Sequence, residues 1–255
     1  MNEMQTERLL FRPWQETDAE ALYKYASDPE VGPRAGWEPH KSVDESLETI
    51  RTLFSCGTMW AIVLKATNEP IGCIGYLPKG QSNIPLGDDE AEVGYWVARS
   101  YWNQGICTEA LWWLIDICFN QRNFRTLWGD YFVDNPASGR VMQKCGFVDT
   151  GTQTTCPDLM VGSDRIVRVA RLNRICQSCG MPLTADDQYG THADGTVCLD
   201  YCKYCYRDGA FVDQVTMEEY IDMCSQFGAQ AGMTNEQMRA HCQQLFPLLK
   251  RWKDR

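Results

Sequence analysis

The chain of 255 residues lacks long apolar runs. No stretch of about 18 consecutive apolar residues is present, so the sequence contains no candidate for a membrane-spanning helix. Its first residues, MNEMQTER, also lack the basic and then apolar pattern of a secretory signal peptide. The sequence therefore predicts a cytoplasmic protein that does not associate with a membrane.

The chain also lacks an excess of positive charge. Its net charge is −10, and both of its parts are acidic: residues 1–172 hold 16 Lys and Arg against 23 Asp and Glu, and residues 174–255 hold 8 against 11. Affinity for DNA or RNA depends on Lys and Arg side chains that neutralise phosphates. The composition therefore argues against a nucleic-acid partner and favours positively charged binding partners through long-range attraction.

Cysteine, in contrast, is abundant. The 13 cysteines are odd in number, and several lie in apolar runs such as LIDIC at 114–118. A secreted disulfide framework is typical of much shorter chains with an even number of cysteines. Buried free thiols together with a metal site in a reducing cytoplasm explain this composition better.

Four of these cysteines form two identical pairs, Cys176-x2-Cys179 and Cys202-x2-Cys205. Each pair can occupy a tight turn with both sulfur atoms facing inward, and two such turns supply the four thiolates of a closed, structural Zn²⁺ site. Cys198 and His192 are alternative ligands. A redox-active Cys-x-x-Cys is the alternative function, but the βαβ context of that motif is missing.

Helix and strand signals alternate through residues 1–172. Strands are predicted at 8–14, 59–65, 71–77, 91–97, 125–133, 148–155 and 165–171, and helices at 17–27, from 42, at 105–119 and at 136–144. The first helix is expected to begin at an N-cap in Thr17 or Asp18 with a capping box to Glu20, and the second at Ser42 with Glu45. The pattern predicts a mixed α and β (α+β) domain.

A second domain is expected over residues 173–255, after a linker near Asn173. Two helices are predicted there, at 216–227 and 234–251, and Pro247 is expected to kink or shorten the latter. About 80 residues with few large apolar side chains form a thin core, which a bound metal ion stabilises. This segment resembles a zinc-ribbon family through CQSCGMPL at 176–183 and YCKYCY at 201–206.

Residues 92–110 indicate a strand, a turn that contains Gly105, and the start of a helix. The first N–H groups of a helix have no acceptor within the helix, and the dipole makes that end positive. Such a helix start can hold a pyrophosphate without a basic side chain.

Four segments then give a resemblance. In order they are TERLLFRP at 6–13, AEVGY at 91–95, QGICTEA at 104–110, and NPAS at 135–138 leading to KCGF at 144–147. They resemble the GCN5-related N-acetyltransferase (GNAT) superfamily, in particular its branch of ribosomal-protein and small-molecule acetyltransferases. The resemblance covers most of residues 1–172 and implies a GNAT-type acyl-CoA N-acyltransferase fold. The chain departs from the acetyl-CoA signature at Trp102, where Gln or Arg is usual, and at Cys107, where Gly or Ala is usual.

The resemblance implies that acetyl-CoA is the cosubstrate and is bound by three segments. They are the main chain of Trp96 and Val97 for the pantetheine arm, Gln104, Gly105, Ile106, Cys107 and Thr108 for the pyrophosphate, and Asn135 and Ser138 for the pantetheine or sulfur end. A splayed strand at the first segment would also aim an N–H at the thioester carbonyl.

The resemblance also implies catalytic and acceptor groups. Glu92, on the strand that faces the acceptor, is the predicted general base, through water; the alternative is a solvated or ion-paired glutamate. Many members supply a tyrosine acid where this chain has Met142, so Ser138 is the candidate donor to the departing thiolate, although a thiol with a pKa of about 8.5 also leaves unaided. Trp37 is predicted to line the acceptor site, whereas His40 is expected on the loop surface.

Two functions remain open at this level. The first is an N-acetyltransferase in which a primary amine of a small molecule or peptide attacks acetyl-CoA directly. The second is a non-catalytic scaffold that binds CoA and recruits a protein partner, or a second copy, through its zinc domain.

Cys107 and Cys145 are expected to pack in the interior rather than to act as nucleophiles, because no histidine lies near either in the sequence.

Overall fold

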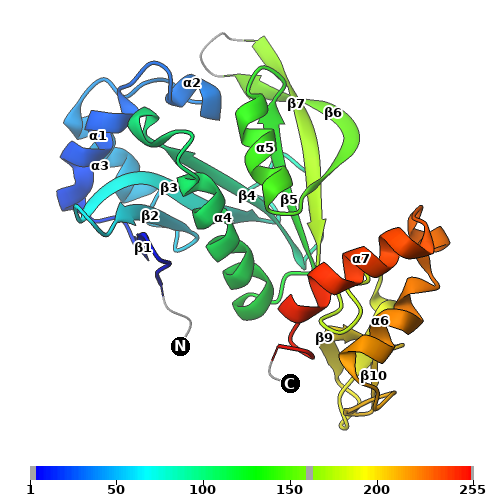
Figure 1. The fold of residues 1–255 in the computed structure, drawn as a ribbon. Helices are drawn as coiled ribbons and strands as arrows, with labels where there is room; N and C mark the ends of the chain where they lie inside the picture. The colour runs from blue at the N-terminus through cyan, green and yellow to red at the C-terminus, as the bar shows by residue number, and fades with distance from the viewer. Residues whose placement is uncertain (1–3, 159–162, 254–255) are drawn as a thin grey trace. The chain divides into compact units, whose positions relative to one another are not determined.

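A computed structural model describes residues 4–158 and 163–253 of the chain. Within it the chain divides into two units, Met1–Leu172 and Asn173–Arg255 (Figure 1). Each unit has its own cluster of buried hydrophobic residues. Among the described residues, no helix has both the length and the apolar character needed to cross a membrane.

The first unit is built on a seven-stranded sheet with the order β1-β2-β3-β4-β5-β7-β6 (Figure 1). The strands are β1 Leu9–Arg12, β2 Met59–Leu64, β3 Glu69–Pro78, β4 Glu90–Val97, β5 Thr126–Phe132, β6 Val148–Asp158 and β7 Ser163–Asn173. Strands β1 to β4 pair antiparallel in sequence order, whereas β4 and β5 are parallel and therefore need a crossover connection. This arrangement confirms the predicted mixed α and β fold.

Helices cover both faces of this sheet (Figure 1). They are α1 Ala19–Ala26, α2 Gly32–Ala35, α3 Val43–Thr52, α4 Ile106–Asp116 and α5 Pro136–Lys144. On one face, Leu22 of α1 and Ile50 of α3 pack against side chains of β2 and β3. On the other, α4 forms the crossover between β4 and β5 and packs in the largest core cluster.

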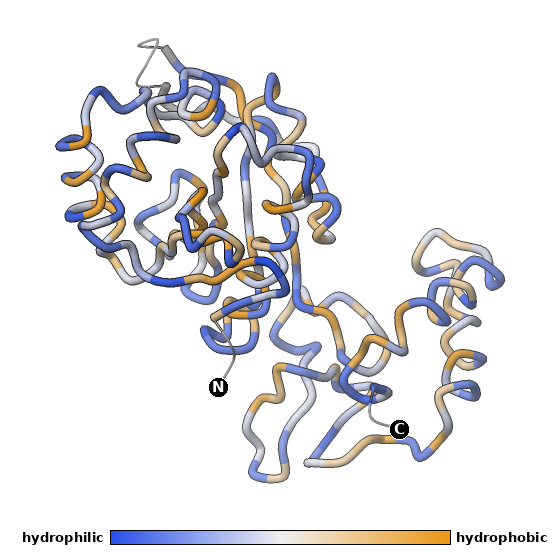
Figure 2. The backbone as a smooth tube through the Cα atoms, turned by 60° about the vertical axis from the view of Figure 1, so that its left-hand side comes forward, coloured by the Kyte–Doolittle hydropathy of each residue, from blue (hydrophilic) through white to orange (hydrophobic). Residues whose placement is uncertain are grey.

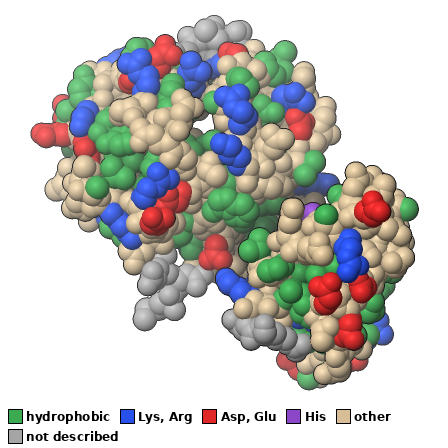
Figure 3. All heavy atoms as spheres, in the orientation of Figure 1, with side chains coloured by type: hydrophobic (Ala, Val, Ile, Leu, Met, Phe, Trp, Pro, Cys, Tyr) green, Lys and Arg blue, Asp and Glu red, His purple; other side chains and the backbone are tan. Residues whose placement is uncertain are grey.

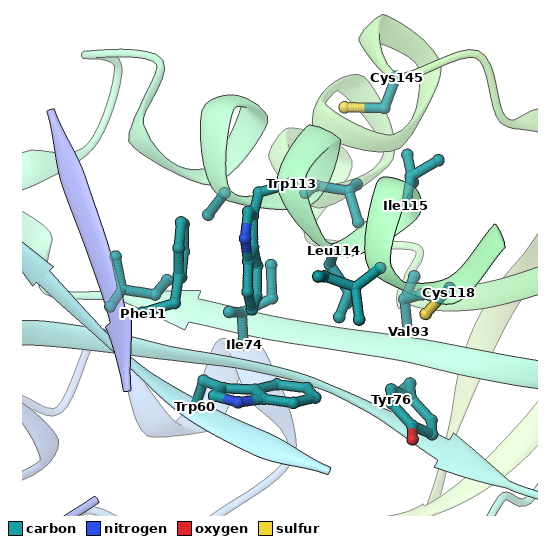
Figure 4. Packing of buried hydrophobic residues seen from close by; sticks show 14 of the residues in the cluster. Phe11, Trp60, Ile74, Tyr76, Val93, Trp113, Leu114, Ile115, Cys118 and Cys145 are labelled. Carbon is teal, nitrogen blue, oxygen red and sulfur yellow. The ribbon is translucent and has the colours of Figure 1, made fainter. Parts of the chain in front are cut away.

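Aromatic side chains fix α4 on the sheet (Figure 4). The ring of Trp113 stacks on Phe11 of β1 at a centroid distance of 3.8 Å, and it meets Trp60 of β2 edge-on at 5.5 Å. Leu111 and Leu114 of the same helix are fully buried. Because this packing holds the helix along its length, it also fixes where its N-terminal end lies relative to β4.

The helix starts agree only in part with the sequence. As predicted, Ser42 caps α3, because its Oγ accepts the N–H of Glu45 at 3.1 Å. Asp18, one of the two predicted positions, is the N-cap residue of α1, which begins at Ala19 after a 3₁₀ turn. Its side chain makes no capping hydrogen bond, so the predicted capping box with Glu20 is wrong. The carboxylate of Asp18 instead pairs with Arg12 of β1 at 2.6 Å and accepts the N–H of Gln15 at 2.9 Å.

The second unit combines short strands with two helices. The strands are β8 Tyr189–Thr191, β9 Val197–Cys202, β10 Tyr206–Arg207 and β11 Ala210–Phe211, and the helices are α6 Met217–Ser225 and α7 Asn235–Leu245. Pro247 lies in a 3₁₀ turn, Phe246–Leu248, that follows α7, so the predicted shortening of this helix is confirmed.

Hydrophobic and hydrophilic stretches alternate along the backbone of both units (Figure 2). Charged side chains of both signs are interspersed on the face that Figure 3 shows.

Candidate active site and metal centre

Strand β4 turns alternate side chains to opposite faces of the sheet. Val93 and Val97 are buried in the core cluster beneath α4, whereas Trp96 packs in the cluster that contains α1 and α3. Glu92 and Gly94 share the face of Trp96 by alternation. A Cβ placed on Gly94 would meet no atom within 4 Å, so open space lies over β4 between Glu92 and Trp96.

Strands β4 and β5 part soon after they begin. Their register pairs residues 90–92 with residues 126–128. Neither strand pairs with the other over its remaining residues, all of which the structure describes. The two strands therefore form the splayed arrangement that the sequence analysis expected at this point.

The register with β3 decides which main-chain groups of β4 face the gap. The N–H of Ala98 donates to the carbonyl of Ile71 at 2.8 Å, and hydrogen-bonded pairs alternate along an antiparallel ladder. The main chain of Trp96 therefore faces β3 and not the gap. Tyr95 and Val97 direct their main-chain groups toward β5, so the structure places Val97, but not Trp96, where the sequence analysis expected main-chain contacts with pantetheine.

A left-handed turn leads into α4. Asn103 and Gly105 have φ angles of 59° and 77°. The first helical hydrogen bond joins the N–H of Glu109 to the carbonyl of Gly105 at 2.9 Å, so the N–H groups of residues 106–108 have no acceptor within the helix. The indole of Trp102, which departs from the family signature, donates to the carbonyl of Val97 at 2.9 Å and ties this turn to β4.

Two cysteines lie near this helix start. Burial raises the pKa of Cys107 and of Cys145 to about 12 in each case. The Sγ of Cys145 donates to the carbonyl of Thr108 at 3.6 Å. Both thiols therefore stay protonated at neutral pH, as expected for packing residues rather than nucleophiles.

The start of α5 is tied to two other elements. The hydroxyl of Tyr95 in β4 donates to the carbonyl of Ser138 at 2.9 Å and lies 3.1 Å from its Oγ. The Nδ2 of Asn135 donates to the carbonyl of Arg34 in α2 at 3.0 Å. These contacts fix the position of Ser138 and commit the side-chain amide of Asn135 to α2.

Glu92 is a buried carboxylate with an unusual environment. It is 8% exposed, and its Oε2 accepts the hydroxyl of Ser82 at 2.5 Å. Burial and, to a smaller extent, the negative charge of Asp130 raise its pKa, the bond from Ser82 partly offsets the increase, and the resulting pKa is about 7. A carboxylate that titrates near neutral pH is suited to accept a proton.

Ser82 and Asp130 are site residues that the sequence analysis missed. Ser82 lies in the loop before β4 and is oriented by the N–H of Ile84, which donates to its Oγ at 2.8 Å. Asp130 lies two residues after Trp128, the register partner of Glu92, and therefore on the same face. Burial raises the pKa of Asp130 as well. The alternation of β5 and its parallel register with β4 are the signals that could have revealed it.

An aromatic wall borders this face. The ring of Trp37 meets that of Trp96 edge-on at 5.7 Å, and Gly32 makes room for it, because a Cβ there would lie 2.6 Å from the Trp37 ring. His40, expected on the loop surface, is half-buried, with its Nδ1 2.7 Å from the Oγ of Ser46 in α3. Burial lowers the pKa of His40, so the ring is neutral at pH 7.

The four paired cysteines of the second unit come together. The ligand atoms of Cys176, Cys179, Cys202 and Cys205 all lie within 4.8 Å of one another. The N–H of Cys202 donates to the Sγ of Cys176 at 3.2 Å, and the Tyr220 hydroxyl lies 3.0 Å from the Sγ of Cys205. Four largely buried sulfur atoms with hydrogen-bond donors around them fit a tetrahedral Zn²⁺ ion. Cys198 and His192 are not part of this group.

The C-terminal segment is hydrogen-bonded to the turn that carries Cys176 and Cys179. Arg251 donates its main-chain N–H to the carbonyl of Gln177 at 3.1 Å and its Nη1 to the Oγ of Ser178 at 2.9 Å. The indole of Trp252 donates to the carbonyl of Ser178 at 2.8 Å. The Arg251 side chain is fully buried, and its Nη2 also pairs with Asp213 at 2.5 Å.

Comparison with known families identifies both units. The model of the acetyltransferase (GNAT) domain matches residues 8–148, more than half of the chain. The chain belongs to the GNAT acetyltransferase family. A zinc ribbon domain model matches residues 175–253. The first unit is thus an acetyl-CoA-dependent acyltransferase, and the four-cysteine cluster lies in a zinc-ribbon domain.

Relatives and solved structures agree with this assignment. This chain is 29% identical over 153 residues to the N-acetyltransferase YoaA of Bacillus subtilis. The aligned residues make up 58% of this chain and 84% of the relative. The chain is 30% identical over 156 residues to the N-acetyltransferase p20 of Bacillus licheniformis, covering 59% and 85%. A GNAT-family acetyltransferase structure from Bacillus anthracis matches with a TM-score of 0.58 at 21% identity, covering 66% of this chain and 96% of that one. A spermidine N-acetyltransferase from Vibrio cholerae in complex with CoA and spermine matches with a TM-score of 0.54 at 17% identity, covering 66% and 96%.

Proposed function

We propose that the enzyme transfers the acetyl group of acetyl-CoA to a primary amine by direct attack, with Glu92 as the general base. The thioester supplies an activated acetyl group. In the transfer the amine nitrogen bonds to the carbonyl carbon, the carbon–sulfur bond breaks, and the amine proton passes to Glu92 directly or through water. The observation that carries the proposal is a buried carboxylate with a pKa of about 7 beside the open space over Gly94.

The cosubstrate is proposed to lie across the gap between β4 and β5. The main-chain groups of Tyr95 and the N–H of Val97 face this gap and would pair with the pantetheine arm, whereas the carbonyl of Val97 accepts the indole of Trp102. The free N–H groups at the start of α4, in the segment Gln104, Gly105, Ile106, Cys107 and Thr108, would hold the pyrophosphate. A test is Gly105→Asp, which adds a side chain and a negative charge there and should weaken CoA binding measured by calorimetry.

Ser138 is proposed to donate a hydrogen bond to the departing CoA thiolate. Tyr95 gives its own proton to the carbonyl of Ser138, so the Ser138 hydroxyl, 3.1 Å from the Tyr95 oxygen, keeps its proton and can turn it from that oxygen to the thiolate. Asn135, whose amide is bonded to α2, is proposed to contact the pantetheine arm through the rest of its side chain or its main chain. Because a thiol of pKa about 8.5 is a good leaving group, this contact is a modest contribution.

The acceptor is proposed to be a cationic amine of a small molecule or peptide. Glu92 and Asp130 place two carboxyl groups on one face, and the rings of Trp37 and Trp96 border it. Carboxylates and aromatic rings both attract ammonium groups. The spermidine acetyltransferase among the structural neighbours acts on such an amine.

The second unit is proposed to be a structural domain with a closed zinc site. Four protein ligands leave no position for substrate, so the site contributes folding energy rather than chemistry. A surface for a protein partner or a second copy is a further proposed role of this unit. A cytoplasmic location is also proposed, and the buried free thiols of the chain, which suit a reducing compartment, support it.

Release of CoA thiol with a panel of amines tests the proposed reaction. The panel contains a polyamine, an aminoglycoside and peptides with a free α-amine or a lysine. We expect amine-dependent thiol release together with an N-acetylated product identified by mass spectrometry. Binding of acetyl-CoA without turnover of any amine would contradict the proposed reaction.

A further inference from the structure

A hydrogen-bond network joins the segment before β1 to the start of α4, about a hundred residues later. The Nε of Arg8 pairs with the Oε2 of Glu109 at 2.6 Å, and the main-chain N–H of Arg8 donates to Oε1 at 3.0 Å. The hydroxyl of Thr6 donates to the same Oε1 at 2.5 Å. The Nη1 of Arg8 donates to the carbonyl of Gln104 at 2.9 Å. One arginine thus contacts both the loop and the first turn of the helix.

The contact with Gln104 fixes the direction of the next N–H group. In a planar trans peptide the C=O and the N–H point in opposite directions. Because Arg8 holds the carbonyl of Gln104, the N–H of Gly105 points away from the guanidinium. A Cβ on Gly105 would lie 3.6 Å from the Nη2 of Arg8, so this group lies directly beside the turn.

The contact with Glu109 changes the charge near the proposed anion site. Burial raises the pKa of Glu109, but hydrogen bonds from Thr6 and Arg8 outweigh that effect and lower it, so the side chain is ionised at neutral pH. An ionised carboxylate in the first turn of α4 repels a pyrophosphate. Residues 104–108 contain no Lys or Arg that could offset it. Arg8 supplies that positive charge from another part of the chain.

We propose that Arg8 is a positioning residue for the cosubstrate. It orients the N–H of Gly105 and neutralises Glu109, so that the start of α4 can bind the pyrophosphate of acetyl-CoA. This role rests on the proposed placement of CoA at that helix start, and it adds a residue that lies outside the CoA loop in the sequence.

The Arg8→Met variant tests this role in two measurements. Its dissociation constant for CoA should rise about tenfold, which is the loss expected when one charge-assisted hydrogen bond is removed. S-acetylpantetheine carries the same thioester without the pyrophosphate. The ratio of kcat/KM for acetyl-CoA to that for S-acetylpantetheine should therefore fall by a similar factor. A role in folding alone would lower both rates together and leave this ratio unchanged, which would overturn the proposal.

Other variants distinguish a loss of the Arg8 contacts from a wrong placement of CoA. Glu109→Gln combined with Arg8→Met should recover part of the lost affinity, because no uncompensated carboxylate remains. Arg12→Met is the matched control: it removes another arginine–carboxylate pair, Arg12 with Asp18, and should leave CoA affinity unchanged. If Gly105→Asp weakens CoA binding and Arg8→Met does not, the role of Arg8 is wrong while the CoA placement stands. If neither weakens it, the placement itself is wrong.

Discussion

Each of the two units buries a charged side chain, and their surroundings differ. Arg251 in the zinc-ribbon unit is fully buried, paired with Asp213, hydrogen-bonded to Ser178, and lies within 5 Å of the ring centroids of Phe211, Tyr220 and Trp252. Glu92 in the acetyltransferase unit receives a neutral hydroxyl and lies near a second carboxylate. A compensated charge is typical of a structural residue, whereas a buried charge beside a like charge is typical of a functional site.

The buried clusters of the two units also differ in composition. The first unit has a large apolar cluster in which α4 packs on the sheet through rings and branched side chains. In the second unit, the main buried cluster includes Cys176, Cys202 and Cys205, the proposed metal ligands. We therefore expect the second unit, but not the first, to depend on metal for its folding.

The largest predicted effect is the loss of zinc from the second unit. The purified protein should contain one zinc ion per chain, and Cys176→Ser or Cys202→Ser should remove it. Structural zinc supplies about 10 to 16 kcal/mol of apparent binding free energy, so the second unit should unfold while the first stays folded. Metal analysis measures the zinc content, and hydrogen exchange measures the unfolding of each unit separately.

The controls for this prediction are Cys56→Ser and Cys224→Ser, which should keep the zinc. Equal zinc content in all four variants would contradict the proposed ligand set. Simultaneous unfolding of both units after zinc removal would contradict the expected difference between them.

The zinc ligands and the CoA loop could be predicted from the sequence because their residues are close together along the chain. The repeated Cys-x2-Cys spacing and the segment around Gly105 are local patterns. The partners of Glu92 could not be predicted in this way, since Asp130 reaches it only through the parallel register of β4 and β5. The same holds for Arg8 and Glu109, which are brought together by the packing of β1 and α4. The face and register of strands decide such contacts, and neither is a local property.

The second prediction concerns the buried arginine. Arg251→Met leaves Asp213 without its partner and removes the bond to Ser178 in the first cysteine turn. Removal of one member of a buried ion pair costs roughly 3 kcal/mol. The variant should therefore release zinc to a chelator faster than the parent protein.

Arg239→Met is its matched control, because Arg239 pairs with Glu218 and Asp222 on the surface of α6 and α7. An exposed pair contributes at most about 1 kcal/mol. Equal rates of zinc release in the two variants would show that the Arg251 contacts do not support the metal site.

The third prediction is a smaller change in stability in the opposite direction: Glu92→Gln should make the first unit more stable at high pH. The folded state raises the pKa of Glu92 from 4.5 to about 7, so the contribution of this group to stability is complete below pH 4.5 and is lost as the pH rises to 7. Above pH 7 the buried carboxylate costs up to about 3 kcal/mol. The variant should thus be more stable than the parent at pH 8, and nearly equal to it at pH 4.5.

Denaturant unfolding of the first unit at the two pH values measures this difference. Glu90→Gln, which removes another carboxylate from the same strand, is the control. A Glu92→Gln variant that is less stable than the parent at pH 8 would mean that the carboxylate stabilises the fold.

The dependence of kcat/KM on pH for the parent enzyme, Glu92→Gln and Glu90→Gln is the most direct test of Glu92 as the general base. With the best acceptor amine, kcat/KM of the parent should rise as the pH passes about 7, where Glu92 loses its proton. Glu92→Gln should lower kcat/KM by about 10²- to 10⁴-fold at pH 7, with partial recovery at higher pH as free amine accumulates and with CoA affinity unchanged. Glu90→Gln should keep the parent profile. If Glu92→Gln instead keeps the parent rate across this pH range, Glu92 is not the general base.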